Sequence, residues 1–292
     1  MTWRYRLYGL ETESEIDLGD LPAGDRQLAR DVRIVSRPVP PRSGKTGGWF
    51  EVQGGKVIID LPPSGRFEIE DGTNIAVDNA ASGLASLRWR LLGVACGALL
   101  HQRGVLPLHC TLVSISGRAI GFLGQSGAGK STIAAHLQAR GHQILVDDVC
   151  VAVPGESRRL VVEPGHGYLR LWEDASAALG QEVGRPLDPA TTKFEHRIPV
   201  ANRERIVVSA LMELCEGNPV GIRPLSSLQR MRLCLEHTYC RDLMVDLDRR
   251  GRNLAQCAEV AAAVPGFSLT RPKDLGRMPV VLDLIEQCVA QL

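Results

Sequence analysis

The hydrophobic pattern of the chain changes near residue 80. Before that point, short stretches of alternating apolar and polar residues are separated by Gly, Pro, Asp and Ser, which is typical of short β-strands joined by turns. We expect strands over residues 3–10, 31–37, 49–52, 56–61 and 66–70. From about residue 81 to 102, Leu and Ala recur at three- and four-residue spacings. This spacing predicts one long helix.

Beyond residue 105, apolar runs of strand length alternate with amphipathic helical patterns. The runs predict strands over 106–114, 118–123, 143–153 and 205–213, and the helical patterns cover 131–140, 227–235, 254–264 and 278–291. Such alternation predicts an α/β fold. We therefore expect a small β-rich N-terminal domain over 1–80, a connecting helix over 81–104 and an α/β domain over 105–292.

Composition places the chain among ordinary globular proteins. Of its 292 residues, 44% are hydrophobic and 23% charged, and 34 basic against 33 acidic residues give a formal charge of +1. This balance argues against a general nucleic-acid binder. The start of the chain lacks the apolar segment of a secretory signal, and the most apolar stretch, 91–100, is too short to span a bilayer. We expect a soluble cytoplasmic protein with no membrane or nucleic-acid partner. The eight cysteines form no C-x-x-C pair, so we expect neither a disulfide nor a structural zinc.

The strongest chemical signal lies between the predicted strand 118–123 and the predicted helix 131–140. The sequence there matches the phosphate-binding pattern G-x-x-x-x-G-K-[ST] in full. Glycines let the backbone curl so that its N–H groups point at a phosphate, the lysine neutralises phosphate charge, and the serine hydroxyl suits Mg²⁺. The pattern does not separate ATP from GTP. We expect ATP with Mg²⁺ as cofactors, bound by Gly124, Gln125, Ser126, Gly127, Ala128, Gly129, Lys130, Ser131 and Thr132.

Two further features could carry the reaction. Asp147 and Asp148 follow the apolar residues 144–146, sixteen and seventeen residues after Ser131. Strands of open α/β sheets bind ligands at their carboxyl ends, where one carboxylate can hold Mg²⁺ and its neighbour can accept a proton. The pair could also merely begin a turn. His109, inside an apolar strand, is either a buried core histidine or a catalytic one.

Together these motifs resemble the catalytic domain of bacterial HPr kinase/phosphorylase over residues 108–153. In that family a histidine-containing strand, a G-x-x-G-x-G-K-S loop and an R-G-H-x-x-x-x-D-D segment follow one another, as they do here at 108–109, 124–131 and 140–148. The resemblance implies a P-loop kinase fold related to phosphoenolpyruvate carboxykinase for the domain 105–292. It also implies transfer of the γ-phosphoryl group to a serine hydroxyl.

The same resemblance implies roles for individual residues. Asp147 corresponds to the general base, His109 lies beside it, and Lys130 holds the phosphates. Ser131 and Asp148 belong to the metal site. Related kinases assemble as multimers, so a homo-oligomer is a further expectation.

The chain also departs from that family. The family's later glycine-rich signature, thought to serve the reverse phosphorolysis, is not recognisable at residues 161–172, and the β-rich first half differs from the family's own N-terminal domain. The layout is similar to stand-alone HPr-kinase-like proteins of peptide biosynthetic clusters, such as lasso-peptide kinases that modify the C-terminal residue of a precursor. This resemblance implies an acceptor serine on a peptide or small protein, such as the C-terminal serine of a lasso-peptide precursor.

Two other functions stay open at this point. One is a small-molecule kinase that acts on free serine, and the other is a nucleotide-binding regulator without transfer activity. Four more polar residues could lie near the site or could be surface charges: Glu163 as a metal carboxylate, and Arg170, Lys193 and Arg197 as cations that steady the transferring phosphoryl group.

Overall fold

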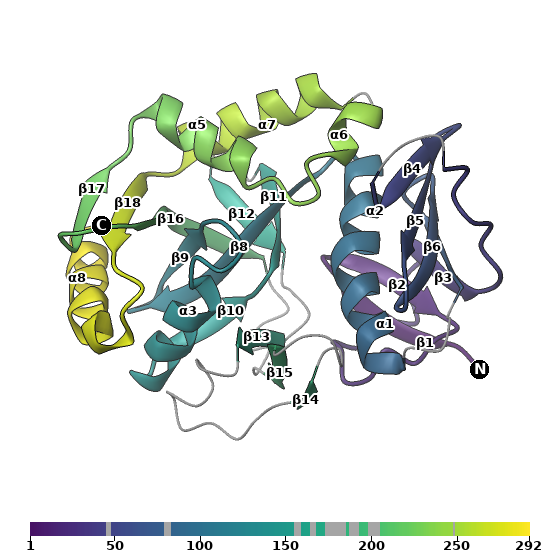
Figure 1. The fold of residues 1–292 in the computed structure, drawn as a ribbon, viewed down its shortest axis with the longest axis horizontal. Coiled ribbons are helices and arrows are strands. Elements are labelled where there is room, and N and C mark those ends of the chain that lie inside the picture. Colours follow the sequence, from purple (N-terminus) through teal and green to yellow (C-terminus); the bar gives the residue numbers. More distant parts are fainter. Residues whose placement is uncertain are drawn as a thin grey trace. The chain divides into compact units, whose positions relative to one another are not determined.

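The computed structural model describes residues 1–44, 48–78, 83–154, 159–163, 168–172, 185–186, 193–197, 205–247 and 249–292. The chain forms two compact units (Figure 1). The first consists of Met1–Val105, Pro186–Thr191 and Cys240–Arg252, and the second of Leu106–Arg185, Thr192–Tyr239 and Asn253–Leu292. The helix that was expected to connect two domains therefore belongs to the first unit.

The first unit contains a seven-stranded sheet with the strand order β1-β2-β3-β7-β6-β5-β4. The expected strand over 3–10 is instead a hairpin, because Tyr8 and Gly9 adopt left-handed φ angles of 54° and 79° and turn the chain back. The hydrophobic pattern also missed β7. The strands are β1 (Trp3–Leu7), β2 (Leu10–Ser14), β3 (Val32–Ser36), β4 (Phe50–Gln53), β5 (Lys56–Leu61), β6 (Gly65–Glu70) and β7 (Asn74–Asp78).

One long helix packs against this sheet. It runs without interruption through α1 (Leu84–Arg90), a π-helical turn η1 (Leu91–Ala95) and α2 (Cys96–Gln102), and contacts β6. Leu87, Leu91, Leu92 and Leu99 are buried at the predicted helical spacing, whereas Leu84 at the start of the helix is exposed. The Tyr8 hydroxyl donates to the Leu92 carbonyl at 2.6 Å. A short helix, α6 (Leu243–Asp246), packs on α2. The predicted long helix is confirmed from Leu84 onward, and the two residues expected before it, 81 and 82, lie outside the described part of the chain.

The second unit contains a mixed eight-stranded sheet in which five strands close on themselves. β8 pairs with β9, β9 with β16, β16 with β12, β12 with β11, and β11 with β8 again. β16 is parallel to β9 and β18. The strands are β8 (Leu106–Ile115), β9 (Arg118–Leu123), β10 (Gln143–Val146), β11 (Val149–Pro154), β12 (Leu160–Glu163), β16 (Ile206–Glu216), β17 (Gly221–Pro224) and β18 (Gly266–Arg271); a separate small sheet contains β13 (Tyr168–Trp172), β14 (Arg185–Pro186) and β15 (Lys193–Arg197).

Helices cover both faces of the larger sheet (Figure 1). Successive side chains of a strand point to opposite faces, so β8 and β9 contribute to two cores. One core packs under α3 (Lys130–Ala139) and α8 (Met278–Ala290), and the other under α5 (Ser227–Glu236) and α7 (Arg250–Ala263). A 3₁₀ turn, η3 (Leu275–Arg277), precedes α8. The mixed α/β class expected from the sequence is confirmed. No helix within the described ranges is both long and apolar enough to cross a membrane.

The strand expected over residues 143–153 is interrupted. It forms β10 and β11, and the two residues between them are Asp147 and Asp148. Asp148 has a φ of 74°, in the left-handed region that few residues other than glycine adopt, although Asp tolerates it better than most. The break therefore falls at the two carboxylates that the sequence singled out, while the strands on both sides of it pair antiparallel with β8.

Candidate functional site

A glycine-rich loop (Gly124–Gly129) joins the end of β9 to the start of α3. Gly127 and Gly129 have φ angles of 82° and 90°, and Gly129 is the N-cap of α3. A β-carbon at Gly124 would come within 3.0 Å of the Ala128 side chain. The backbone therefore follows a tight curl that glycine permits at these positions, and it ends on the positive end of a helix dipole, where anions are favoured.

Lys130 folds back over this loop. Its ammonium group donates to the carbonyl oxygen of Gly124 at 2.8 Å and lies 3.4 Å from that of Gln125, and only 6% of the residue is exposed. The lysine charge is therefore held inside the curl of the loop. A compact, buried ammonium group in this place is suited to neutralise a phosphate.

Ser131 connects the loop to the aspartate pair. Its hydroxyl lies 3.1 Å and 3.3 Å from the two carboxylate oxygens of Asp147. The serine stands in the first turn of α3 and the aspartate directly after β10, so the contact joins two elements that lie side by side in the fold. The structure thereby brings together two groups that the sequence separated by sixteen residues.

Asp147 is almost entirely buried, with 4% of its surface exposed. Its carboxylate also accepts hydrogen bonds from the Thr111 hydroxyl at 2.6 Å and from the Arg170 backbone N–H at 3.1 Å. Burial raises the pKa of Asp147 above its ordinary value, the bond from Thr111 opposes that rise, and the neighbouring charge of Asp148 adds to it. Three donors thus converge on one buried carboxyl group.

Asp148 faces a different set of side chains. The Arg170 guanidinium forms a close ion pair with it, and the His109 ring and the Tyr239 hydroxyl each lie 3.5 Å from its carboxylate oxygens. His109 and Tyr239 meet edge to face, with ring centroids 5.8 Å apart. Asp148 is also the more open of the two aspartates, with 17% of its side chain exposed. His109 is therefore part of a polar cluster and not of the hydrophobic core.

Sheet register explains how these distant residues meet. His109 lies opposite Val149 in the β8–β11 pairing, so it stands directly beside the break that carries both aspartates. The segment after α5 is bonded to β8: the His109 N–H donates to the His237 carbonyl at 2.8 Å, and the Tyr239 N–H donates to that of Pro107 at 2.9 Å. These backbone bonds place Tyr239 next to His109 from more than a hundred residues further along the chain.

The four polar residues with weaker claims from the sequence lie in different places. Arg170 belongs to the aspartate cluster through both its backbone and its side chain. Glu163 is buried in β12 and accepts a hydrogen bond from Arg205 at 2.7 Å. Arg197 lies on β15 with an exposed side chain, and the side chain of Lys193 lies outside the described part of the structure. Thr111 and Tyr239 are members of the cluster that sequence reasoning missed, because neither forms a recognisable motif.

The oxygen groups at the start of α3 fit a magnesium ion. Mg²⁺ is usually held by one or two carboxylates together with substrate phosphates, and it prefers oxygen ligands. Ser131 and Asp147 place a hydroxyl and a carboxylate within hydrogen-bonding distance of each other beside a loop suited to phosphate. The residues present therefore fit a nucleotide with its magnesium ion.

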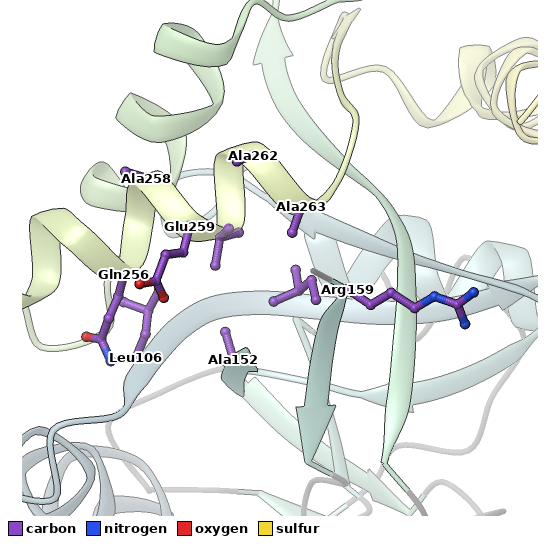
Figure 2. A pocket seen from close by; sticks show the side chains of 10 residues that line it. Leu106, Ala152, Arg159, Gln256, Ala258, Glu259, Ala262 and Ala263 are labelled. Carbon is purple, nitrogen blue, oxygen red and sulfur yellow. The ribbon is translucent and has the colours of Figure 1, made fainter. Parts of the chain in front are cut away.

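An apolar pocket of about 500 Å³ lies elsewhere in the second unit, beneath α7 (Figure 2). Glu259 and Gln256 extend from the helix towards Leu106, and Ala152 lies below them on β11, as Figure 2 shows. Leu106 and Ala152 belong to the core on the α5–α7 side, whereas Thr111 alternates to the other side of β8. The pocket is thus separate from the aspartate cluster. Its full lining is Leu106, Ala152, Arg159, Leu160, Gln256, Ala258, Glu259, Val260, Ala262 and Ala263.

Comparisons with known proteins give a distant structural likeness. No family model and no curated protein matches the sequence. Among solved structures, the chain is similar to the HPr(Ser) kinase/phosphatase from Coxiella burnetii, with 12% sequence identity, 63% of this chain and 91% of that chain covered, and a TM-score of 0.35. A TM-score this low does not establish a shared fold.

Proposed function

We propose that this protein is an ATP- and Mg²⁺-dependent kinase that transfers a phosphoryl group to a hydroxyl of a peptide or small protein. One observation carries the proposal: the hydroxyl of Ser131, at the end of the phosphate-binding motif, meets the carboxylate of Asp147, and the adjacent Asp148 lies in a second polar cluster. A nucleotide site and a group that can accept a proton are thus adjacent. A protein that only binds nucleotide does not require the second group.

The binding roles follow from the contacts of the loop. The curled backbone of residues 124–129 and the start of α3 offer N–H groups to the phosphates, and Lys130 adds a buried positive charge. Ser131 and Asp147 would hold the cation. When bound, ATP with Mg²⁺ supplies the phosphoryl group and neutralises much of the charge that develops on it.

We assign the two aspartates the opposite way from the sequence-based expectation. Asp147 is buried, and three donors fix it against the loop serine, so it suits the cation. Asp148 is more open and lies against His109 and Tyr239, so it suits the acceptor hydroxyl, whose proton it would accept. The Arg170 side chain holds Asp148 in place and adds positive charge near the transferring group. Phosphoryl transfer requires little covalent help from the protein, so positioning and charge supply most of the catalysis.

The identity of the acceptor rests on the sequence resemblance. A serine at the C-terminus of a lasso-peptide precursor is the acceptor that we propose, and the partner is accordingly a peptide or small protein. A homo-oligomeric assembly and a cytoplasmic location are parts of the same proposal.

The test compares two conservative variants, Asp148→Asn and Asp147→Asn. Each is measured for ATP affinity with and without Mg²⁺, and for transfer from γ-labelled ATP to synthetic peptides ending in serine and to free serine. We expect Asp148→Asn to lose transfer by roughly 10²-fold or more with ATP affinity nearly unchanged. Asp147→Asn should lose the Mg²⁺-dependent part of ATP affinity. Asp283→Asn is a matched control, because this carboxylate pairs with Arg140 on the surface and should change neither quantity.

The outcomes distinguish the alternatives. Full transfer by Asp148→Asn would remove Asp148 from the role of proton acceptor. Phosphorylation of free serine in preference to every peptide would indicate a small-molecule kinase. ATP binding by the wild type with no transfer to any acceptor would leave a nucleotide-binding regulator.

A further inference from the structure

Arg271 reaches the glycine-rich loop from a strand near the end of the chain. It is the last residue of β18, which lies beside β16 in the sheet, and only 6% of it is exposed. Its guanidinium donates to the Ala128 carbonyl oxygen at 2.6 Å and to the Pro272 carbonyl oxygen at 3.1 Å. The first of these bonds ties β18 directly to the loop.

The guanidinium lies against the backbone of Gly129. A β-carbon on Gly129 would come within 2.1 Å of the Arg271 nitrogen that bonds Ala128, and Gly129 already has a left-handed φ of 90°. Glycine at this position, which directly precedes Lys130, therefore avoids both a strained backbone and a displacement of the guanidinium. A side chain at Gly129 would have to push the arginine away from the loop.

The bond to Ala128 also determines where the next amide points. A trans peptide is planar, and its C=O and N–H point in opposite directions. When Arg271 holds the Ala128 carbonyl on one side, the Gly129 N–H of the same peptide is directed to the other side. A charged donor on the carbonyl polarises the peptide and strengthens its N–H as a hydrogen-bond donor.

The charge of Arg271 is only weakly balanced by the protein. Its Nε is buried without a hydrogen-bond acceptor, and no carboxylate in the described ranges lies within ion-pairing distance of the guanidinium. Burial lowers the pKa of Arg271, and the field of Glu216, which pairs with Lys273, opposes that effect only in part. A buried cation with no close counter-charge is costly, and a bound anion would relieve the cost.

We propose that Arg271 is a positioning residue of the nucleotide site, which orients the Ala128–Gly129 peptide towards the phosphates and whose charge the bound phosphates balance. The inference rests on the proposed function, because it assumes that the loop binds a phosphate chain. It adds to the motif a residue from a strand about 140 positions away. Arg271 acts through the loop and needs no contact with the nucleotide.

The test measures the affinities for ATP, ADP and AMP in the full-length chain with Mg²⁺ present. We expect Arg271→Gln to lower the affinities for ATP and ADP by about 10- to 100-fold, which is the equivalent of one or two charge-assisted hydrogen bonds. The affinity for AMP should stay nearly unchanged. Arg271→Lys keeps the charge but lacks the planar fork, so it should fall between the wild type and Arg271→Gln. It also serves as the variant to measure if Arg271→Gln does not fold.

Arg118→Gln is the matched control. Its guanidinium also donates to a backbone carbonyl at 2.6 Å, that of Val289, but at the other end of β9 from the loop. We expect it to lower thermal stability without changing the ratio of ATP to AMP affinity. The same result for both Arg271 variants would overturn the inference, since Arg271 would then be structural only. A wild type that does not prefer ATP to AMP would instead refute the proposed function itself.

A double variant gives a second test. Gly129→Ala should weaken ATP binding strongly in the wild type, because the new methyl group meets the Arg271 guanidinium. In the Arg271→Ala background the same substitution should lower the ATP affinity by a smaller factor, since only the backbone strain remains. Equal losses in the two backgrounds would contradict the close packing on which the inference depends.

Discussion

The hydrogen bond from Thr111 to Asp147 allows a quantitative test of the site. The substitution Thr111→Val replaces the hydroxyl with a methyl group of similar size, so the packing of β8 changes little. Thr111 is fully buried, at 0% exposure, so water should not easily replace the lost donor. The variant therefore removes a single interaction, the 2.6 Å bond to the carboxylate, from the buried aspartate.

The expected loss of stability depends on the charge of Asp147. A hydrogen bond to a charged group contributes about 1.5–3 kcal/mol, and a bond between neutral groups about 1 kcal/mol. We therefore expect Thr111→Val to lower the free energy of unfolding by about 2–3 kcal/mol where Asp147 is ionised and by about 1 kcal/mol where it is protonated.

The direction of the pH dependence follows from the pKa of Asp147. Burial raises this pKa above its unfolded value, so the group's contribution to stability is present at low pH and is lost as pH rises through the folded pKa. The Thr111 bond opposes the rise, so its removal raises the pKa of Asp147 further. The cost of Thr111→Val should accordingly increase with pH and level off above the folded pKa.

Urea unfolding of the wild type and of Thr111→Val, from mildly acid to mildly alkaline pH without Mg²⁺, measures this cost. Thr12→Val is the control: Thr12 is also a buried threonine, but its hydroxyl bonds the Leu10 carbonyl, and its cost should not vary with pH. A cost for Thr111→Val below about 0.5 kcal/mol, or one independent of pH, would refute the argument that this hydroxyl supports an ionisable buried carboxylate.

Two further predictions concern the second unit. Burial, and secondarily the charge of Lys130, lower the pKa of His237 to about 4. Because the folded state favours the neutral histidine, the free energy of unfolding should fall as pH drops from about 6.5 towards 4. Thermal unfolding of His237→Gln across that range should show a weaker pH dependence than the wild type, and an unchanged one would contradict the prediction. Arg140 pairs with Asp283 and Glu286 on α8 at 2.7 Å and 2.9 Å, and Arg140→Ala should cost at most about 1 kcal/mol, less at high salt, with ATP affinity unchanged. A larger loss that salt does not reduce would indicate a structural role beyond these surface pairs.

Local features of the fold were predictable because they depend on neighbouring residues. Buried strands and helices place apolar residues at every second or at every third to fourth position, and this periodicity is visible in the sequence. The long helix and the strands β5, β8 and β9 were therefore predicted close to their observed bounds. The glycine-rich loop could be found for the same reason, since its curl depends on glycines within six consecutive residues. The strand β7 and the hairpin at Tyr8 were missed, because pattern alone does not place every turn.

The composition of the site was only partly predictable. Lys130, Ser131 and the aspartate pair could be proposed from one stretch of sequence, and His109 from the family resemblance. Thr111, Tyr239 and Arg271 could not, because each reaches the site through a strand pairing or a backbone bond to a distant segment. No short-range pattern encodes which residues face one another across a sheet.

The sequence by itself determined that a phosphate-binding motif stands between a strand and a helix and that two carboxylates follow the next apolar run. Only the tertiary structure decided which partners each carboxylate contacts. The left-handed backbone at Asp148 directs the two neighbouring side chains to different partners, Asp147 to the loop serine and Asp148 to His109. Adjacent identical residues cannot be told apart by local pattern, because their difference arises from the surroundings that the folded sheet brings to each.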